Sequence, residues 1–218
     1  MAGLAERFLA ELLVLGALLG WWLMSLGMPD YIFPAPLAVA KKTLQLFTDP
    51  QFMDDTALSA LRVILSVVAA VILGTLLALM VDWWPATKAI VHERIKPFLN
   101  SFPSIGWAIM AVIWFGQSNL TVMFVQVMIL TPFCLINVSE GLRDLDRELL
   151  EMGRSFTRNP VKQFLKITLP LLMPYIMAAV RIGYGVAWKI SLVAELFGAE
   201  SGLGYVMLRA QTVADGAL

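Results

Sequence analysis

Three charged side chains lie in an otherwise apolar stretch near the end of the chain. Residues 169–197 carry Arg181, Lys189 and Glu195 among mostly hydrophobic neighbours. Arg181 follows Pro170 by 11 residues, which is about 17 Å along a helix and close to the centre of a bilayer. A central arginine costs about 2.5–3.5 kcal/mol to insert, so it should face a cavity or a partner. Arg181 therefore either forms an internal ion pair or helix-cap contact, or lines a pathway that favours an anion.

The remaining residues do not provide the side chains of an enzyme. The chain has one cysteine, Cys134, and one histidine, His92, too few for an internal disulfide or a His-rich metal site. It contains no Gly-Lys dipeptide of a P-loop and no G-x-S-x-G. We predict no catalytic, cofactor or metal site, with Cys134 as a buried small residue and His92 as a loop residue. A membrane enzyme acting on lipid, which would need a cluster of such side chains, is disfavoured.

The composition predicts an all-α integral membrane protein. Of 218 residues, 59% are hydrophobic and only 15% are charged, against about 25% charged in soluble domains. The mean hydropathy of +0.78 implies more apolar surface than one soluble domain of this size can bury. The charges cancel to a net charge of zero, so there is no basic footprint for nucleic acid.

Runs of uncharged residues predict where the chain crosses the membrane, because a spanning helix needs about 20 apolar residues. The polar stretch 116–119 makes the turn between the third and fourth helices. The first run lacks an A-x-A site and has acidic residues in front, which favours a retained span over a signal peptide. In a single domain of residues 1–218, the five predicted transmembrane helices are about 9–28, 60–82, 97–116, 120–138 and 169–197.

The segment 30–56 is a polar to amphipathic insert between the first two spans. It contains a short helix that starts at Pro36. Asp54 and Asp55 are the expected N-cap residues of the second span. Arg62 stands at the mouth of that span, where a long side chain can extend to the lipid headgroups.

The distribution of cations predicts the orientation of these spans. Ten of the sixteen lysines and arginines lie in the N-terminal segment and in the loops 82–96 and 139–168. Cytoplasmic loops carry such an excess. The N-terminus and both loops are therefore expected in the cytoplasm, and the insert and the C-terminus outside.

The loop 139–168 has the pattern of an amphipathic helix followed by a break. Asn159 and Pro160 provide an N-cap and a first helical residue for a second short helix. The apolar stripe either packs on the chain's own bundle or is offered to a partner. It consists of Leu142, Leu145, Leu149, Met152 and Phe156.

The same loop resembles the EAA motif of ABC-importer permeases, E-A-A-x3-G-x9-I-x-L-P. The residues that match this motif at its spacing are Glu151, Ile167, Leu169 and Pro170. Met152 and Gly153 replace the paired alanines, and Thr157 stands where the family has glycine. Because a β-branched residue resists the turn that glycine permits, the bend is expected near residues 159–160.

Other segments resemble the nitrate, sulfonate and taurine branch of these permeases. They include Pro34-Ala35-Pro36, Leu61-Arg62-Val63, Trp114-Phe115-Gly116, Pro132, Asn137, Gly141, Arg181, Trp188, Ala194-Glu195 and Gly202-Leu203-Gly204. Members of this branch normally have one more membrane helix after the fifth. The chain therefore either is truncated or functions with five spans.

The resemblance implies that the chain is the permease subunit of a type I importer in the bacterial inner membrane. Such an importer consists of a permease homodimer embedded in membrane lipid, two cytoplasmic ATPase subunits and an extracytoplasmic solute-binding protein. The residues expected to couple the loop to the ATPase are Glu151, Met152, Gly153, Thr157, Ile167, Leu169 and Pro170. Those expected to form the translocation pathway or outer gate are Arg181, Lys189, Glu195, Gly202 and Gly204. The expected solute is a small anion such as nitrate, a sulfonate, taurine or bicarbonate. A neutral pyrimidine or flavin compound is the alternative, and a secondary transporter, for which we find no inverted repeats, is less favoured.

Overall fold

The computed structural model describes residues 2–29, 32–156 and 159–212, and their regular structure is entirely helical. The predicted all-α class is confirmed. The elements are α1 (Ala2–Ser25), α2 (Pro36–Leu46), α3 (Pro50–Trp83), η1 (Pro85–Thr87), η2 (Ala89–Ile95), α4 (Lys96–Ser101), α5 (Ser104–Phe115), α6 (Asn119–Asp144), α7 (Arg147–Phe156), α8 (Pro160–Gln163), η3 (Phe164–Thr168), α9 (Leu169–Gly198) and α10 (Leu203–Thr212).

Four helical segments in the described part of the chain are long and apolar enough to cross a membrane. They are Arg7–Ser25, Pro50–Trp83, Asn119–Asp144 and Pro160–Gly198. A fifth candidate consists of Pro85–Ser101 and Ser104–Phe115, which meet at 88°. The break falls at Phe102 because the residue before a proline is driven to an extended conformation, and Phe102 has ψ 124°.

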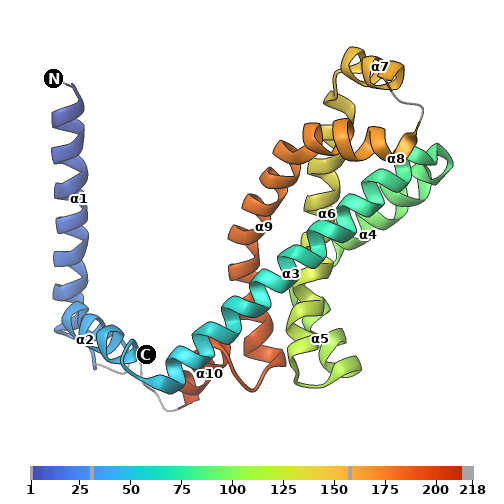
Figure 1. The fold of residues 1–218 in the computed structure, drawn as a ribbon. Coiled ribbons are helices and arrows are strands. Elements are labelled where there is room, and N and C mark those ends of the chain that lie inside the picture. Colours follow the sequence, from blue (N-terminus) through green and yellow to red (C-terminus); the bar gives the residue numbers. More distant parts are fainter. Residues whose placement is uncertain (1, 30–31, 157–158, 213–218) are drawn as a thin grey trace.

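The core is a bundle of α3, α6 and α9, which lie beside one another in Figure 1. The buried Cys134 of α6 lies against Gly74 of α3, as a Cβ at Gly74 would be only 2.6 Å from the Cys134 Cβ. Small residues of this kind let membrane helices approach closely. The expectation that Cys134 is a buried small residue is confirmed.

Helix α1 stands apart from this bundle, and α2 links it to the start of α3 (Figure 1). The indole N–H of Trp21 donates a hydrogen bond to the Pro34 carbonyl at 3.1 Å, which fixes the corner between α1 and α2. Apolar side chains of α1, among them Leu13 and Leu23, are exposed. This surface fits lipid, since it lies on a helix long enough to span the membrane.

The start of α3 differs from the expectation. Its N-cap is Asp49, whose Oδ1 accepts a hydrogen bond from the Gln51 N–H at 2.9 Å, with Pro50 at the first helical position. Asp54 and Asp55 lie inside the helix, so the prediction that they cap it is wrong. The Asp-Pro pair satisfies a free amide and presets φ for the first turn, which makes it the stronger start signal.

Of two other local predictions, one is confirmed and one is wrong. The turn at residues 116–119 is confirmed, with Gly116 at φ 66° and Ser118 as the N-cap of α6. The segment 82–96 is largely helical rather than an open loop, and His92 lies in η2, so its description as a loop residue is wrong.

Candidate functional site

The coupling loop predicted from the sequence folds into α7, α8 and η3 at one end of the bundle (Figure 1). α8 begins as predicted. The Asn159 Oδ1 accepts hydrogen bonds from the N–H groups of Val161 and Lys162 at 3.0 and 3.2 Å, and Pro160 occupies the first helical position. Thr157 lies outside the described residues.

Gly153 is the point at which α7 packs onto η3. It is buried, and a Cβ added there would collide with the Cδ1 of Ile167. The Gln163 side-chain amide adds a hydrogen bond to the Leu150 carbonyl at 3.3 Å. Two positions of the predicted motif, Gly153 and Ile167, are thus in direct contact, while Leu169 and Pro170 begin α9 immediately after η3.

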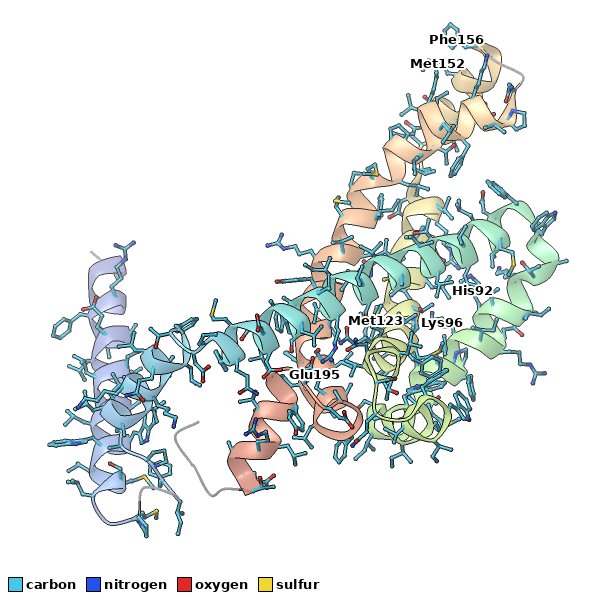
Figure 2. The ribbon with its side chains drawn as sticks, turned by 60° about the horizontal axis from the view of Figure 1, so that its bottom comes forward. His92, Lys96, Met123, Met152, Phe156 and Glu195 are labelled. Carbon is cyan, nitrogen blue, oxygen red and sulfur yellow. The ribbon has the colours of Figure 1, made fainter. Side chains whose placement is uncertain are left out.

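The apolar stripe of α7 that flanks Gly153 is exposed. Leu149, Met152 and Phe156 are 38%, 53% and 82% exposed. Figure 2 shows Met152 and Phe156 at the extremity of the molecule, away from the bundle. Since the chain's own bundle leaves these three side chains uncovered, this half of the stripe is offered outward. Glu151 is also exposed on α7.

A second group of polar residues lies at the other end of the bundle. Arg62 of α3 and Glu195 of α9 form an ion pair of 2.9 Å, with side chains 3% and 0% exposed. The expectation that Arg62 extends to the headgroups is therefore wrong. Both groups are shielded from water, and in such surroundings the attraction between a guanidinium and a carboxylate is stronger than at the protein surface.

All five N–H donors of Arg62 are used, which satisfies a buried guanidinium completely. Its Nε and one terminal nitrogen donate to the Asn119 Oδ1, and it also donates to Glu195 and to the carbonyl and hydroxyl oxygens of Ser201. Glu195 accepts further bonds from the Ser59 hydroxyl at 2.8 and 2.9 Å and from the Gly204 N–H at 3.0 Å. We call Arg62, Glu195, Ser59, Asn119 and Ser201 the outer polar cluster, where "outer" means only the end of the bundle remote from α7.

The glycine loop before α10 is part of the same arrangement. Gly202 has φ 104°, a conformation that favours glycine, and its N–H donates to the Asp55 Oδ1 at 2.6 Å. A Cβ at Gly202 would lie 2.7 Å from both Arg62 and Glu195, and one at Gly204 would collide with the backbone of α9. The cluster therefore ties α3, α6, α9 and α10 together.

Sequence reasoning named Glu195, Gly202 and Gly204 but missed Ser59, Asn119 and Ser201, and it misplaced Arg62. One signal could have found the pair: Arg62 opens the uncharged run 63–81, and Glu195 is the one acidic residue of the apolar stretch 169–197. Charges inside spans usually pair with one another.

Arg181 and Lys189 do not join the outer polar cluster. Both are exposed on α9, and neither has a hydrogen bond or ion pair within the described ranges. Together with Gly185 they recur every four residues and so follow one helix face. A Cβ at Gly185 would touch nothing within 4 Å, so the space between the two cations is open.

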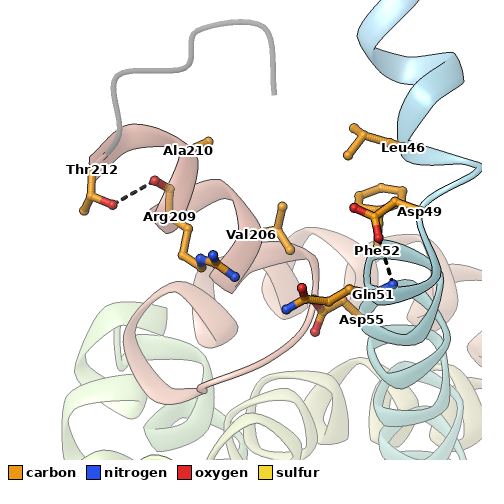
Figure 3. Close-up of a pocket in the computed structure, with 9 residues that line it drawn as sticks. All are labelled: Leu46, Asp49, Gln51, Phe52, Asp55, Val206, Arg209, Ala210 and Thr212. Carbon is orange, nitrogen blue, oxygen red and sulfur yellow. Dashed lines mark hydrogen bonds between the residues drawn. The ribbon is translucent and has the colours of Figure 1, made fainter.

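A cavity of about 230 Å³ lies where α10 faces α2 and the start of α3. Figure 3 shows the guanidinium of Arg209 on one wall and the carboxylates of Asp49 and Asp55 on the other. Both carboxylates already accept backbone hydrogen bonds, so this cavity is built from groups that mainly hold the fold.

Taken together, several membrane-spanning helices, an amphipathic loop helix at one end and a polar cluster at the other define a polytopic membrane permease. Residues 91–217 match the family described as "Binding-protein-dependent transport system inner membrane component". The chain is 30% identical over 208 residues to a "Probable ABC transporter permease protein" of Haemophilus influenzae, covering 94% of this chain and 83% of that protein. The chain therefore belongs to the binding-protein-dependent ABC transporter permeases.

Other relatives carry names that include a solute. The taurine transport system permease protein TauC of Escherichia coli is 26% identical over 195 residues, covering 86% of this chain and 70% of TauC. The formylaminopyrimidine transport permease protein ThiX of Halalkalibacterium halodurans is 29% identical over 196 residues, covering 88% of this chain and 75% of ThiX.

The family is one of transport proteins rather than enzymes, and its members are multi-pass inner-membrane permeases that work with an ATPase and a solute-binding protein. The predicted membership and the non-enzymatic role are confirmed by these relatives.

Proposed function

We propose that this chain is the permease of an ATP-driven importer, coupled to its ATPase through α7 and carrying a small anion. The observation that carries the coupling is the exposed apolar face of α7. An amphipathic helix that presents apolar side chains away from its own fold can lie in a groove of a partner. In this arrangement α7 and the N-terminus face the cytoplasm and two copies of the chain form the pathway.

One continuous helical segment connects the coupling helices to the outer polar cluster. Residues Pro160–Gly198 form one helical segment that contains Ile167 near one end and Glu195 near the other. Glu195 follows Ile167 by 28 residues, or about 42 Å of helix. When the ATPase displaces α7, the movement is therefore transmitted through the Gly153–Ile167 contact to the outer polar cluster. This cluster holds together the residues expected to form the outer gate of the pathway.

The anionic solute is supported by the cationic face of α9. Arg181 and Lys189 are exposed at positions that a membrane would surround, with the open Gly185 between them. Uncompensated cations at such depth belong in a water-filled path rather than against lipid. Relatives named as taurine and aliphatic sulfonate permeases support the same class.

A neutral heterocycle is the second candidate, because the ThiX relative is named for formylaminopyrimidine. The two candidates make different demands on α9. A neutral ring needs no cation, whereas a sulfonate or nitrate is stabilised by Arg181 and Lys189.

The test is reconstitution of the permease with its ATPase and solute-binding protein in proteoliposomes. We expect ATP-dependent uptake of taurine, an aliphatic sulfonate, nitrate or bicarbonate, and a permease homodimer by light scattering. Charge reversal at Glu151 should reduce co-purification of the ATPase and uptake together. Uptake of formylaminopyrimidine alone would replace the anion by the heterocycle, and uptake without the ATPase would contradict the coupling itself.

A further inference from the structure

A basic cavity lies near the α7 end of the bundle, where α3, the η1–η2 segment and α6 meet. It has a volume of about 240 Å³ and is lined by Lys88, His92, Ser139 and Arg143, with Asp82, Val81 and other residues around them. A second cavity, lined in part by Leu150 of α7 and Pro160 of α8, shares Asp82 with the basic cavity. The two cavities therefore lie at the same end of the molecule. The coupling described above does not use this basic cavity.

The charge of the cavity is positive. Within the described ranges, neither Lys88 nor Arg143 forms an ion pair. His92 also lines this cavity from η2, in the Pro85–Ser101 half of the fifth candidate span. Figure 2 shows His92 and Lys96 close together on the ribbon. The two cations on the wall, Lys88 and Arg143, exceed the one carboxylate of Asp82.

A hydroxyl without a partner also lines this cavity. The Ser139 Oγ is buried and has no hydrogen bond in the structure. A serine within a helix can donate to the carbonyl four residues earlier, yet this one does not. Its O–H is available to a group that enters the cavity, and such a group must be an acceptor since both cations around it are donors.

Neighbouring side chains place the cavity at the depth of the lipid headgroups. Trp83 and Trp84 follow Asp82 directly and are 56% and 63% exposed. Exposed tryptophans of membrane proteins are enriched at the membrane–water interface. Ala78 and Val81 form the apolar wall of the cavity on the side of α3.

From these observations we infer that the cavity binds the phosphate of an anionic phospholipid, with Lys88, Arg143 and Ser139 donating to its oxygens. Arginine presents a planar fork that matches phosphate, and lysine adds a compact charge. Asp82 accepts a hydrogen bond from a headgroup hydroxyl, which favours phosphatidylglycerol over phosphatidylcholine. A bound lipid would bridge α3 to α6 beside the coupling helices.

The experiment measures the thermal unfolding midpoint of the purified full-length chain in detergent as phosphatidylglycerol, phosphatidylcholine or inorganic phosphate is added. We expect phosphatidylglycerol alone to raise the midpoint. The double variant Lys88→Gln, Arg143→Gln should weaken the apparent affinity about 30-fold, since each interfacial cation contributes about 1 kcal/mol. Arg94→Gln is the matched control, because Arg94 belongs to the same segment but does not line the cavity.

A second, smaller substitution tests the same cavity with less risk of misfolding. Ser139→Ala removes a hydroxyl that has no partner in the chain, so it should leave the midpoint without lipid unchanged and weaken phosphatidylglycerol binding about tenfold. The inference is overturned if phosphatidylcholine stabilises equally, if inorganic phosphate alone gives the same shift, or if Arg94→Gln loses as much affinity as the double variant. None of these outcomes depends on the transported solute or on the ATPase.

Discussion

The guanidinium of Arg62 and the carboxylate of Glu195 lie 2.9 Å apart, with side chains 3% and 0% exposed. Arg62 belongs to α3 and Glu195 to α9, and their other partners extend the contact to α6, to the loop before α10 and to α10 itself. In Figure 1, α7 and α10 lie at opposite ends of the bundle. The ion pair therefore fixes the end of α9 that is remote from the coupling helices.

Loss of one partner of this pair should be severe. Glu195→Ala leaves the Arg62 charge buried and uncompensated, which costs about 3–5 kcal/mol. We expect a large fall in the thermal unfolding midpoint in detergent and easier proteolysis of the loop around Ser201. Lys189→Ala on the same helix removes an exposed charge and should change the midpoint little.

The double variant Arg62→Met, Glu195→Leu separates charge burial from packing. Replacing a buried ion pair by apolar residues of similar volume is often neutral or stabilising, so the double variant should recover much of the loss caused by Glu195→Ala. If it is no more stable than Glu195→Ala, the cost lies in the remaining hydrogen bonds rather than in the unpaired charge.

Gly202 and Gly185 offer a paired test of backbone conformation. Gly202→Ala places a side chain at φ 104° within 2.7 Å of Arg62 and Glu195, and a strained backbone of this kind costs about 1–3 kcal/mol before the contacts are counted. Gly185→Ala meets nothing within 4 Å and should stabilise α9 by up to about 1 kcal/mol. Thermal unfolding of the two variants should shift in opposite directions; equal shifts would contradict the assigned geometry.

The sequence predicts local features of this chain well. Composition determines the all-α membrane class, and cap chemistry determines the start of α8, where Asn159 and Pro160 satisfy free amides and preset φ. The competition between Asp49 and Asp54 for the cap of α3 is decided by Pro50, a signal that is also local and that the prediction underweighted. Such features depend only on neighbours in the chain.

The outer polar cluster could not be predicted in the same way. Ser59 and Glu195 are 136 positions apart, and their meeting depends on the register of α3 against α9, which periodicity alone leaves open. The exposure of Phe156 has the same origin, because an apolar stripe looks identical in sequence whether its own bundle or a partner covers it. Contacts of this kind require the packed structure.

Phe156 should matter for the ATPase and not for the fold. Because it is 82% exposed, Phe156→Ser should change stability by no more than about 0.5 kcal/mol. As the anchor of a docking helix it should contribute about 2 kcal/mol or more to binding, so ATPase affinity should fall at least about 30-fold. Phe47→Ser, at the C-cap residue of α2, which is 63% exposed, is the control. Unchanged ATPase co-purification with Phe156→Ser would exclude this face of α7 as the docking surface.

Arg181→Gln tests the cationic face of α9. If Arg181 stabilises an anion in transit, its loss should lower uptake by about one to two orders of magnitude while the folded dimer is retained on size exclusion. Arg94→Gln again provides a change of charge away from this face. Loss of folded protein with Arg181→Gln would indicate a structural role, and unchanged sulfonate uptake would remove Arg181 from the pathway.

The contact between Gly153 and Ile167 predicts a rescue that only direct packing explains. Gly153→Ala should be tolerated, because the added Cβ meets the far end of a flexible side chain. Gly153→Val overpacks the contact at a cost of about 1–3 kcal/mol, which should detach α7 from η3 and uncouple ATP hydrolysis from uptake. Ile167→Ala makes room for the valine, so the double variant should regain uptake in proteoliposomes. If Ile167→Ala leaves the defect of Gly153→Val unchanged, α7 transmits its movement to α9 by another route.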